Sequence, residues 1–164
     1  MRASRPAFGL AVVVPVVALL AACGGQSESE RYGDAFTEVA APLQAELIDL
    51  GNALGSSNRR GPISAALGRA NVALDTAAED FAALDPPADI ADIQAELIDA
   101  IDGYKAAVET AREALRSDNN TRASKAIGTF NSKSAAFAGT LGEIGDRIED
   151  AGVPLGEPAT TGTP

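Results

Sequence analysis

The chain has 164 residues and a net charge of −10, and it contains no histidine, no tryptophan and a single cysteine. A charge this negative argues against binding to nucleic acid, which requires a basic surface, and against flat electrostatic contact with anionic lipid headgroups. One cysteine excludes a disulfide within the chain. The length suits one domain with its own hydrophobic core, and the acidity helps to keep such a domain soluble.

The first 22 residues have the composition of a signal peptide. Two arginines and no acid occur in residues 1–5, and residues 6–22, PAFGLAVVVPVVALLAA, carry no charge. A basic head, an apolar stretch and small residues before a cleavage point are typical of secretory signals. A transmembrane helix is the alternative, but it needs about 20 apolar residues, and this run is shorter and is interrupted by Pro15. We therefore predict that residues 1–22 are removed.

The apolar stretch ends at Cys23, and the motif Leu20-Ala21-Ala22-Cys23 resembles the lipobox of bacterial lipoproteins. The resemblance implies that a diacylglycerol group is joined to the Cys23 thiol and that a signal peptidase cleaves between Ala22 and Cys23. A thiolate is a strong nucleophile, which suits this modification. A buried core cysteine is the alternative, but it would not precede the polar residues 24–33. The processed chain would have 142 residues and a net charge of −12.

Polar segments flank the middle of the chain. Residues 23–33, CGGQSESERYG, are predicted to be a flexible tether between the lipid and a folded domain. Residues 152–164 are rich in proline, glycine and threonine and are predicted to be disordered. The folded domain is thus expected to comprise residues 34–151.

Within this domain, apolar residues recur every three or four positions, which is the period of an α-helix with one buried face. The first helix is expected to follow Asp34 as its N-cap, with Pro42 either kinking it or marking its true start. The second is expected to follow Gly61, with Pro62 in its first turn. The two apolar stripes are Phe36, Val39, Leu43, Leu47, Leu50 and Leu54, and then Ile63, Leu67, Ala70, Leu74, Ala77, Phe81 and Leu84.

Two further helices follow the breaks DPPAD, residues 85–89, and SDNNT, residues 117–121, and Asp89 is the expected N-cap of the third helix. Four amphipathic helices with short connections can enclose one core with neighbours antiparallel. The predicted fold is all-α, an antiparallel up-down four-helix bundle. The stripes of these two helices are Ile90, Ile93, Leu97, Ile101, Tyr104, Val108, Ala111 and Leu115, and then Ile127, Phe130, Ser134, Phe137, Leu141, Ile144 and Ile148.

Short motifs recur along the chain. The hexapeptide QAELID occurs at residues 44–49 and 94–99, and ALGRAN at residues 66–71 is similar to AIGTFN at residues 126–131. Duplication of a helical hairpin would explain both pairs and predicts a pseudo-twofold bundle. Convergence among alanine-rich amphipathic helices explains them equally well.

The carboxylates of the repeated hexapeptide, Glu46, Asp49, Glu96 and Asp99, are the first candidates for metal binding. Di-metal sites in helical bundles combine such carboxylates with histidine, which this chain lacks. Helical spacing also places these four beside or away from the apolar stripes. Without histidine there is no such base to activate a serine, and the usual haem ligand is missing. We predict no catalytic residue, no metal and no cofactor.

The fourth helix carries a stripe of small residues, Gly128, Ala135, Gly139 and Gly142, about 130° from its apolar stripe. This stripe is a candidate face for a protein partner, and the alternative is close packing inside the bundle. Ser134, a polar residue on the apolar stripe, gives weak support for a small-molecule pocket.

These features predict a non-catalytic binding or structural module of the cell envelope. Lipid on Cys23 would attach it to the cell membrane, with the domain facing the periplasm or the cell surface. Such a protein resembles the small alanine-rich helical lipoproteins of unassigned activity. A small-molecule or cation-binding lipoprotein is the main alternative, and an enzyme is the least favoured. A protein partner is left open, and no nucleic-acid partner is expected.

Overall fold

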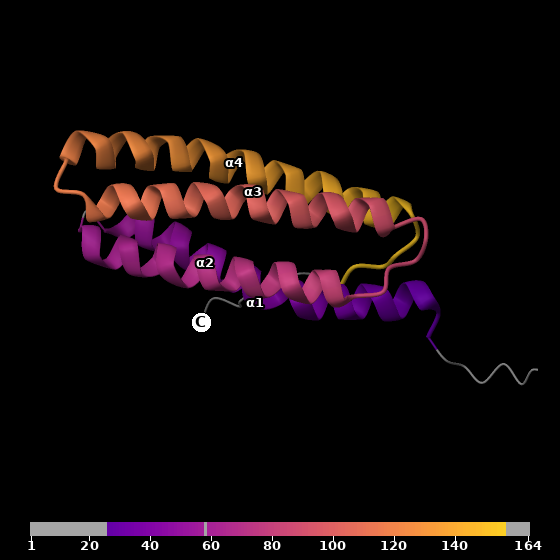
Figure 1. The fold of residues 1–164 in the computed structure, drawn as a ribbon. Helices are drawn as coiled ribbons and strands as arrows, with labels where there is room; N and C mark the ends of the chain where they lie inside the picture. The colour runs from indigo at the N-terminus through magenta and orange to yellow at the C-terminus, as the bar shows by residue number, and fades with distance from the viewer. Residues whose placement is uncertain (1–25, 58, 157–164) are drawn as a thin grey trace, which may run out of the picture.

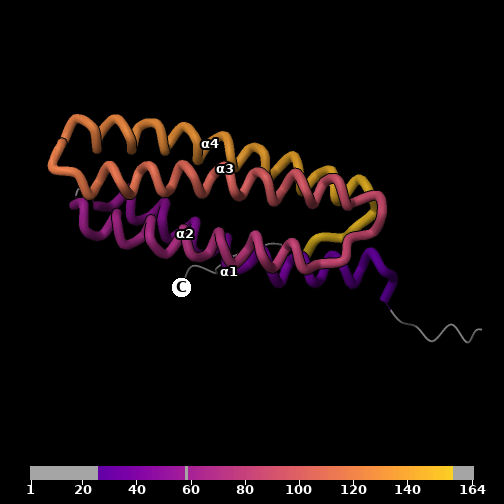
Figure 2. The backbone as a smooth tube through the Cα atoms, in the orientation of Figure 1, coloured from indigo at the N-terminus to yellow at the C-terminus, as the bar shows by residue number. Residues whose placement is uncertain are grey.

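The structure, a computed structural model, describes residues 26–57 and 59–156. These residues form four helices and no strand: α1 (Glu28–Ser56), α2 (Arg60–Ala83), α3 (Ala91–Arg116) and α4 (Asn120–Asp150). The helices lie lengthwise beside one another, and each packs against the next in the chain (Figure 1, Figure 2). The predicted all-α class with four helices is confirmed. Among the described residues, no helix combines the length and the apolarity that crossing a bilayer requires.

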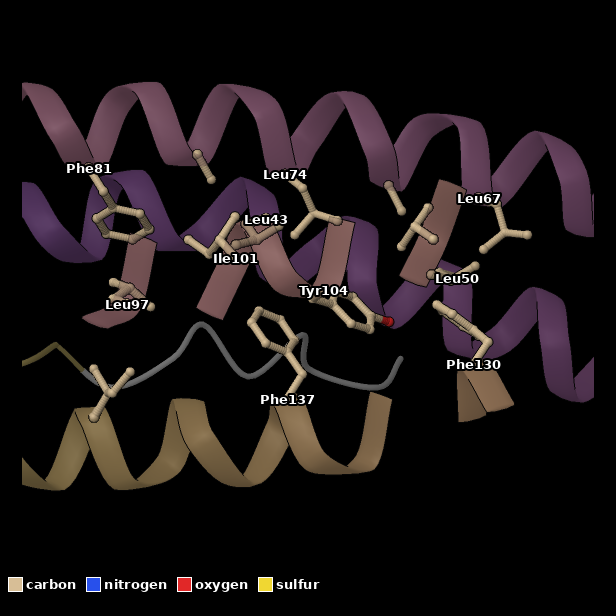
Figure 3. Close-up of a cluster of buried hydrophobic side chains, with 14 of the residues drawn as sticks. Leu43, Leu50, Leu67, Leu74, Phe81, Leu97, Ile101, Tyr104, Phe130 and Phe137 are labelled. Atoms are coloured by element: carbon tan, nitrogen blue, oxygen red, sulfur yellow. The ribbon is translucent and has the colours of Figure 1, made fainter. Parts of the chain in front are cut away.

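One hydrophobic core runs along the assembly and is built from the predicted stripes (Figure 3). The stripes of α2 and α3 are buried almost throughout, and Leu67, Leu74 and Ile101 have no exposed surface. Half-buried stripe residues occur mainly on α1 and α4, since each of these helices packs against one other helix, whereas α2 and α3 each pack against two. Full burial of a Leu or Ile side chain contributes about 1.5–3 kcal/mol, so α2 and α3 form the stable centre.

The fourth side of the assembly, between α1 and α4, is not closed by helix packing. Among the described residues, no Cα atom of α1 lies within 8 Å of one of α4. The chain after α4 turns back toward this side at Gly152, which has a left-handed φ of 83°. The Gly152 N–H donates to the Glu149 carbonyl at 2.8 Å. The Val153 N–H donates to the Ile148 carbonyl at 3.2 Å, which completes a Schellman motif.

Residues 152–156, here called the C-terminal strap, lie against the beginning of α1. The Val153 side chain is 1% exposed, and the Gly156 N–H donates to Thr37 Oγ1 at 3.2 Å. The prediction of a disordered tail is therefore wrong for these five residues, because a buried apolar side chain and backbone hydrogen bonds hold them. Residues 157–164 lie outside the described residues.

Gly33 allows the strap to approach α1. A Cβ atom at Gly33 would lie 2.2 Å from the Pro154 carbonyl oxygen and 3.3 Å from a methyl group of Val153. The first distance is far inside van der Waals contact, so a larger residue would displace the strap. Glycine inside a helix lowers helix stability by about 1 kcal/mol relative to alanine. The close approach of the strap explains why glycine stands here nonetheless.

The helix α1 begins earlier than predicted. The Ser27 hydroxyl accepts from the Glu30 N–H at 3.1 Å, and the Glu30 carboxylate accepts from the Ser27 N–H at 2.6 Å. This capping box fixes the helix start and makes Tyr32 a buried residue of the second helical turn. The predicted tether of residues 23–33 is thus wrong from residue 28 onward, and the predicted N-cap, Asp34, lies inside the helix.

The other helix ends follow the predictions in part. Pro42 lies within α1 and neither starts nor ends it, whereas Pro62 falls in the first turn of α2 as predicted. Asp89 does not cap α3, because the residue at the N-cap position, Ile90, already has helical backbone angles and no side-chain cap forms. The side chain of Asn119 caps α4.

Polar contacts join the helices at both ends of the assembly. At one end, the Arg60 guanidinium donates to the Ser117 carbonyl at 2.5 Å and to the Asn120 side chain, which joins the start of α2 to the turn before α4. At the other end, the Tyr32 hydroxyl donates to Gln94 Oε1 at 2.8 Å and joins α1 to α3. Polar partners of this kind fix the register of packed helices, because a shift would leave them unpaired, at the greatest cost for the buried Tyr32–Gln94 pair.

The two copies of the hexapeptide do not occupy equivalent places. The copy at residues 44–49 ends seven residues before α1 does, and the copy at residues 94–99 ends seventeen residues before α3 does. The related motifs on α2 and α4, by contrast, both begin six residues after the first residue of their helix. The hexapeptides are thus out of register by nearly three turns. The pseudo-twofold arrangement that duplication predicts is not observed for these motifs.

The substitution Gly33→Ala tests the strap. We expect a loss of about 1–3 kcal/mol in the free energy of unfolding, because the new Cβ atom must displace the Pro154 carbonyl. Urea denaturation measures this loss, and amide hydrogen exchange at Val153 and Gly156 should become faster.

Gly51→Ala is the matched control, since a Cβ atom there meets no atom within 4 Å. It replaces a glycine within the same helix and should stabilise the fold by about 0.5–1 kcal/mol. Equal stability and equal exchange in the two variants would show that the strap is not held against α1.

Candidate functional site

The predicted lipid-attachment site lies outside the described residues. Leu20, Ala21, Ala22 and Cys23 all precede residue 26, where the described part begins. The helix α1 begins five residues after Cys23. Cys23 and the first helix are therefore close in the sequence, with four residues between them.

The small residues of the predicted partner face, Gly128, Ala135, Gly139 and Gly142, lie together on the exposed surface of α4. A Cβ atom added at any of the three glycines would meet no atom within 4 Å among the described residues. Close packing inside the bundle, the alternative explanation, is therefore wrong. The four residues of the stripe carry no polar side chain of their own, so they offer shape but no charge or hydrogen bond for a partner.

The carboxylates of the repeated hexapeptide do not converge. Glu46 pairs with Arg69 at 3.3 Å, and Glu96 pairs with Arg147 at 2.5 Å, so each glutamate joins a different pair of helices. The two aspartates are exposed. In the described ranges, no group of three or more Asp, Glu, Cys or His side chains is placed to hold a metal ion. Exposed ion pairs of this kind contribute at most about 1 kcal/mol each.

Ser134 has a structural partner. Its Oγ donates to the Phe130 carbonyl at 3.1 Å and lies 2.9 Å from the Tyr104 hydroxyl, which can donate to it. The Tyr104 ring stacks on Phe137 with centroids 4.3 Å apart (Figure 3). A buried tyrosine needs such a partner for its hydroxyl, so this serine supports the core and does not indicate a ligand pocket.

Tyr32 is the second buried tyrosine, and it is 4% exposed. Its partner Gln94 is itself 6% exposed and donates through Nε2 to the Leu84 carbonyl at 3.4 Å. Burial raises the pKa of Tyr32 to about 12. Burial also raises the pKa of Tyr104, and its hydrogen bond with Ser134 opposes that rise. Both phenols therefore act as neutral hydrogen-bonding groups near neutral pH.

Several open grooves mark the surface of the described residues, and two of them lie along the sides of neighbouring helices. One, of about 610 Å³, extends across α2 from α1 to Arg112 of α3. Its charged side chains compensate one another, because Glu46 and Arg69 form an ion pair within it. The other, of about 530 Å³, lies between α3 and α4 in the half nearer the turn that joins them. We call it the α3–α4 groove.

The α3–α4 groove has a distinct charge. Three cations line it, Arg122, Lys125 and Lys133, and no carboxylate does. Its floor consists mainly of small residues: Gly103, Ala106, Ala107, Ala114 and Ala126. Sequence analysis missed this site because it treated charge as a total; the signal was the spacing of these cations, which places them on one side of α4. The side of the groove formed by α4 can recognise anionic groups, since Arg122, Lys125 and Lys133 carry positive charge.

No protein-family model, curated protein or solved structure matches this chain. The residues of the chain itself therefore carry the functional inference.

The substitution Gly139→Leu should leave the fold intact. The position is open, so we expect unchanged or slightly raised stability, by up to about 1 kcal/mol from helix propensity. Thermal unfolding followed by circular dichroism measures this. A large loss of stability would instead indicate that the small-residue stripe packs inside the bundle.

The substitution Tyr32→Phe should cost about 1–2 kcal/mol at neutral pH, because Gln94 Oε1 loses its donor. The pKa of Tyr32 is higher in the folded state, about 12, than the ordinary 10.0. Its contribution to stability is therefore fully present below pH 10 and is lost as the pH rises toward 12. Urea denaturation between these pH values should show a smaller alkaline loss in the variant than in the wild type.

Tyr104→Phe is the comparison variant. Its loss in the free energy of unfolding at neutral pH should be smaller than that of Tyr32→Phe, since Ser134 keeps its bond to the Phe130 carbonyl. Equal costs for the two variants would contradict the role assigned to Gln94.

Proposed function

We propose that this chain is a lipoprotein of a bacterial cell envelope, anchored through lipid on Cys23, whose domain is an antiparallel up-down four-helix bundle. The domain works outside the cytoplasm as a non-catalytic binding or structural module. The observation that carries the proposal is the motif Leu20-Ala21-Ala22-Cys23 at the end of an uncharged stretch that follows a basic head.

The energetics of membrane attachment favour this anchor. A single acyl chain binds a membrane reversibly, whereas two or more give stable attachment, at about 0.8 kcal/mol per buried methylene. The diacylglycerol group that the motif implies meets this requirement. The apolar stretch would then be needed only for export.

The start of α1 supports a domain held close to the lipid. The capping box at Ser27 and Glu30 begins the helix soon after Cys23, so only four residues would separate the anchor from a rigid element. The buried contact of Tyr32 with Gln94 and the strap contact at Gly33 lie at the same end of α1. The end of the domain nearest the proposed anchor is thus its most extensively joined end.

A binding or structural role is supported by how the polar groups are used. The glutamates considered for metal binding pair with arginines, and the core serine bonds a tyrosine. The surface that these pairs leave available is chiefly the α3–α4 groove, which three cations line. Recognition of a charged partner is the chemistry that such a surface performs.

The substitution Cys23→Ala tests the anchor. In the native host, the wild-type chain should fractionate with membranes, lack residues 1–22 and carry acyl mass. Intact mass spectrometry and envelope fractionation measure both properties. The variant should carry no lipid and should not be cleaved after Ala22, because the peptidase implied by the motif acts on the lipidated cysteine.

The matched control is Cys23→Ala combined with Gln26→Cys, which keeps one thiol but moves it by three residues. It should also stay unlipidated, since the motif fixes the position of the thiol. A wild-type chain that begins at Met1 with an unmodified sulfur would contradict the proposal. A wild-type chain that fractionates with membranes while it still carries residues 1–22 would favour an uncleaved anchor helix.

A further inference from the structure

The α3–α4 groove has two rims of opposite charge. The basic rim on α4 consists of Arg122, Lys125 and Lys133. On α3, Ala106 lines the groove, and exposed acids lie four residues before it and three and seven residues after it, which places them on the same side of that helix. These acids form the acidic rim: Asp102, Glu109 and Glu113.

The charges of the two rims form no ion pair within the described residues, and the electrostatic influence of Asp102 and Glu109 on Lys105 acts over a longer distance. In the described part, no carboxylate oxygen lies within 4 Å of a basic-rim nitrogen, and no Lys or Arg nitrogen lies within 4 Å of an acidic-rim carboxylate. Between the rims lies a floor of small side chains, which allows another helix to approach closely. A partner that complements the groove must therefore carry an acidic edge and a basic edge, separated by about the width of two packed helices.

Contacts between α3 and α4 show which residues of the two rims are level. Glu96 meets Arg147, and Tyr104 meets Ser134. Residue numbers thus fall along α4 as they rise along α3, so Lys125 lies level with roughly residues 113–118 of α3. The basic-rim and acidic-rim charges therefore occupy the same half of the assembly.

We propose that two copies of this chain associate face to face through the α3–α4 groove, about a twofold axis that runs along it. Such an axis exchanges the two sides of the groove and keeps every residue at its own level. Each basic rim then meets the acidic rim of the other copy, with Lys125 facing Glu113. A twofold axis across the groove would instead set basic rim against basic rim, so charge selects the parallel dimer.

The parallel dimer is compatible with the proposed anchor but does not rest on it. Both copies place the start of α1 at the same end, so two lipidated cysteines could enter one membrane. The groove spans about 17 Å of α3, from Gly103 to Ala114, which makes a small interface. The dimer is accordingly weak in dilute solution and is favoured when both copies are confined to one membrane.

Sedimentation equilibrium of the full chain, purified in mild detergent, measures the association. Lys125→Glu should raise the dimer dissociation constant about tenfold or more, because each rim contact occurs twice. Glu113→Lys should do the same. The double variant, Lys125→Glu with Glu113→Lys, should restore association. Arg31→Glu changes the net charge as Lys125→Glu does but lies on α1, and it should have no effect.

Carbodiimide cross-linking of mixed isotope-labelled and unlabelled wild-type chain gives a test that needs no rim variant. Mass spectrometry should find Lys125 of one copy joined to Glu113 of the other. The Cys23→Ala chain should give the same cross-link at higher concentration, so failure of the anchor and failure of the dimer are distinguishable.

Two results would overturn the proposal. One is a wild-type chain that stays monomeric, without cross-links between copies, both in solution and on vesicles. The other is a charge swap that does not restore association lost in Lys125→Glu, since that outcome assigns the groove to a different acidic partner.

Discussion

The open side between α1 and α4 is the constraint on which the rest of the structure depends. A chain of four helices in which only consecutive helices pack leaves one seam where the core meets solvent. Here the residues after α4 cover the end of that seam nearest the start of α1, with Val153 buried and Pro154 against Gly33. The glycine is required by the strap, and the early start of α1 supplies the surface on which the strap lies. The strap, Gly33 and the early start of α1 therefore act together at this seam.

Polar side chains in this domain chiefly fix geometry. Arg60 bonds the turn between α3 and α4, and Tyr32 forms a buried hydrogen bond with Gln94 at the opposite end, so sliding of one helix along another would break both contacts. Apolar stripes alone would tolerate such sliding, because leucine and alanine contacts are similar at neighbouring registers. The charges not used in this way include those on the two rims of the α3–α4 groove. The interior thus specifies the fold, and the remaining surface charge is available for recognition.

The helical period alone was sufficient to predict the four helices and nearly all core residues, because each stripe is long and regular. The boundaries were less predictable. Ser27 and Glu30 form a recognisable capping pair, but the polar composition around them favoured a tether; the buried ring of Tyr32 decides for the helix. The strap was missed because Val153 is a single apolar residue among prolines and glycines, and its burial depends on a seam visible only in three dimensions. The basic rim was not predicted because only the negative net charge of the whole chain was considered, and not this local group of cations.

The strap also brings the chain after α4 back to α1. Gly156 lies beside Thr37, so the last described residues return to the helix with which the domain begins. The turn between α3 and α4 lies at the far end of α4, a helix of 31 residues, about 45 Å away. A circular permutant that joins residue 156 to residue 26 through a flexible linker, long enough to span the roughly 14 Å of α1 between Thr37 and the helix start, and opens the chain at residues 117–119 would thus keep every helix pair. If either end of the domain loses order in this permutant, the original chain connection, and not helix packing alone, holds that end together.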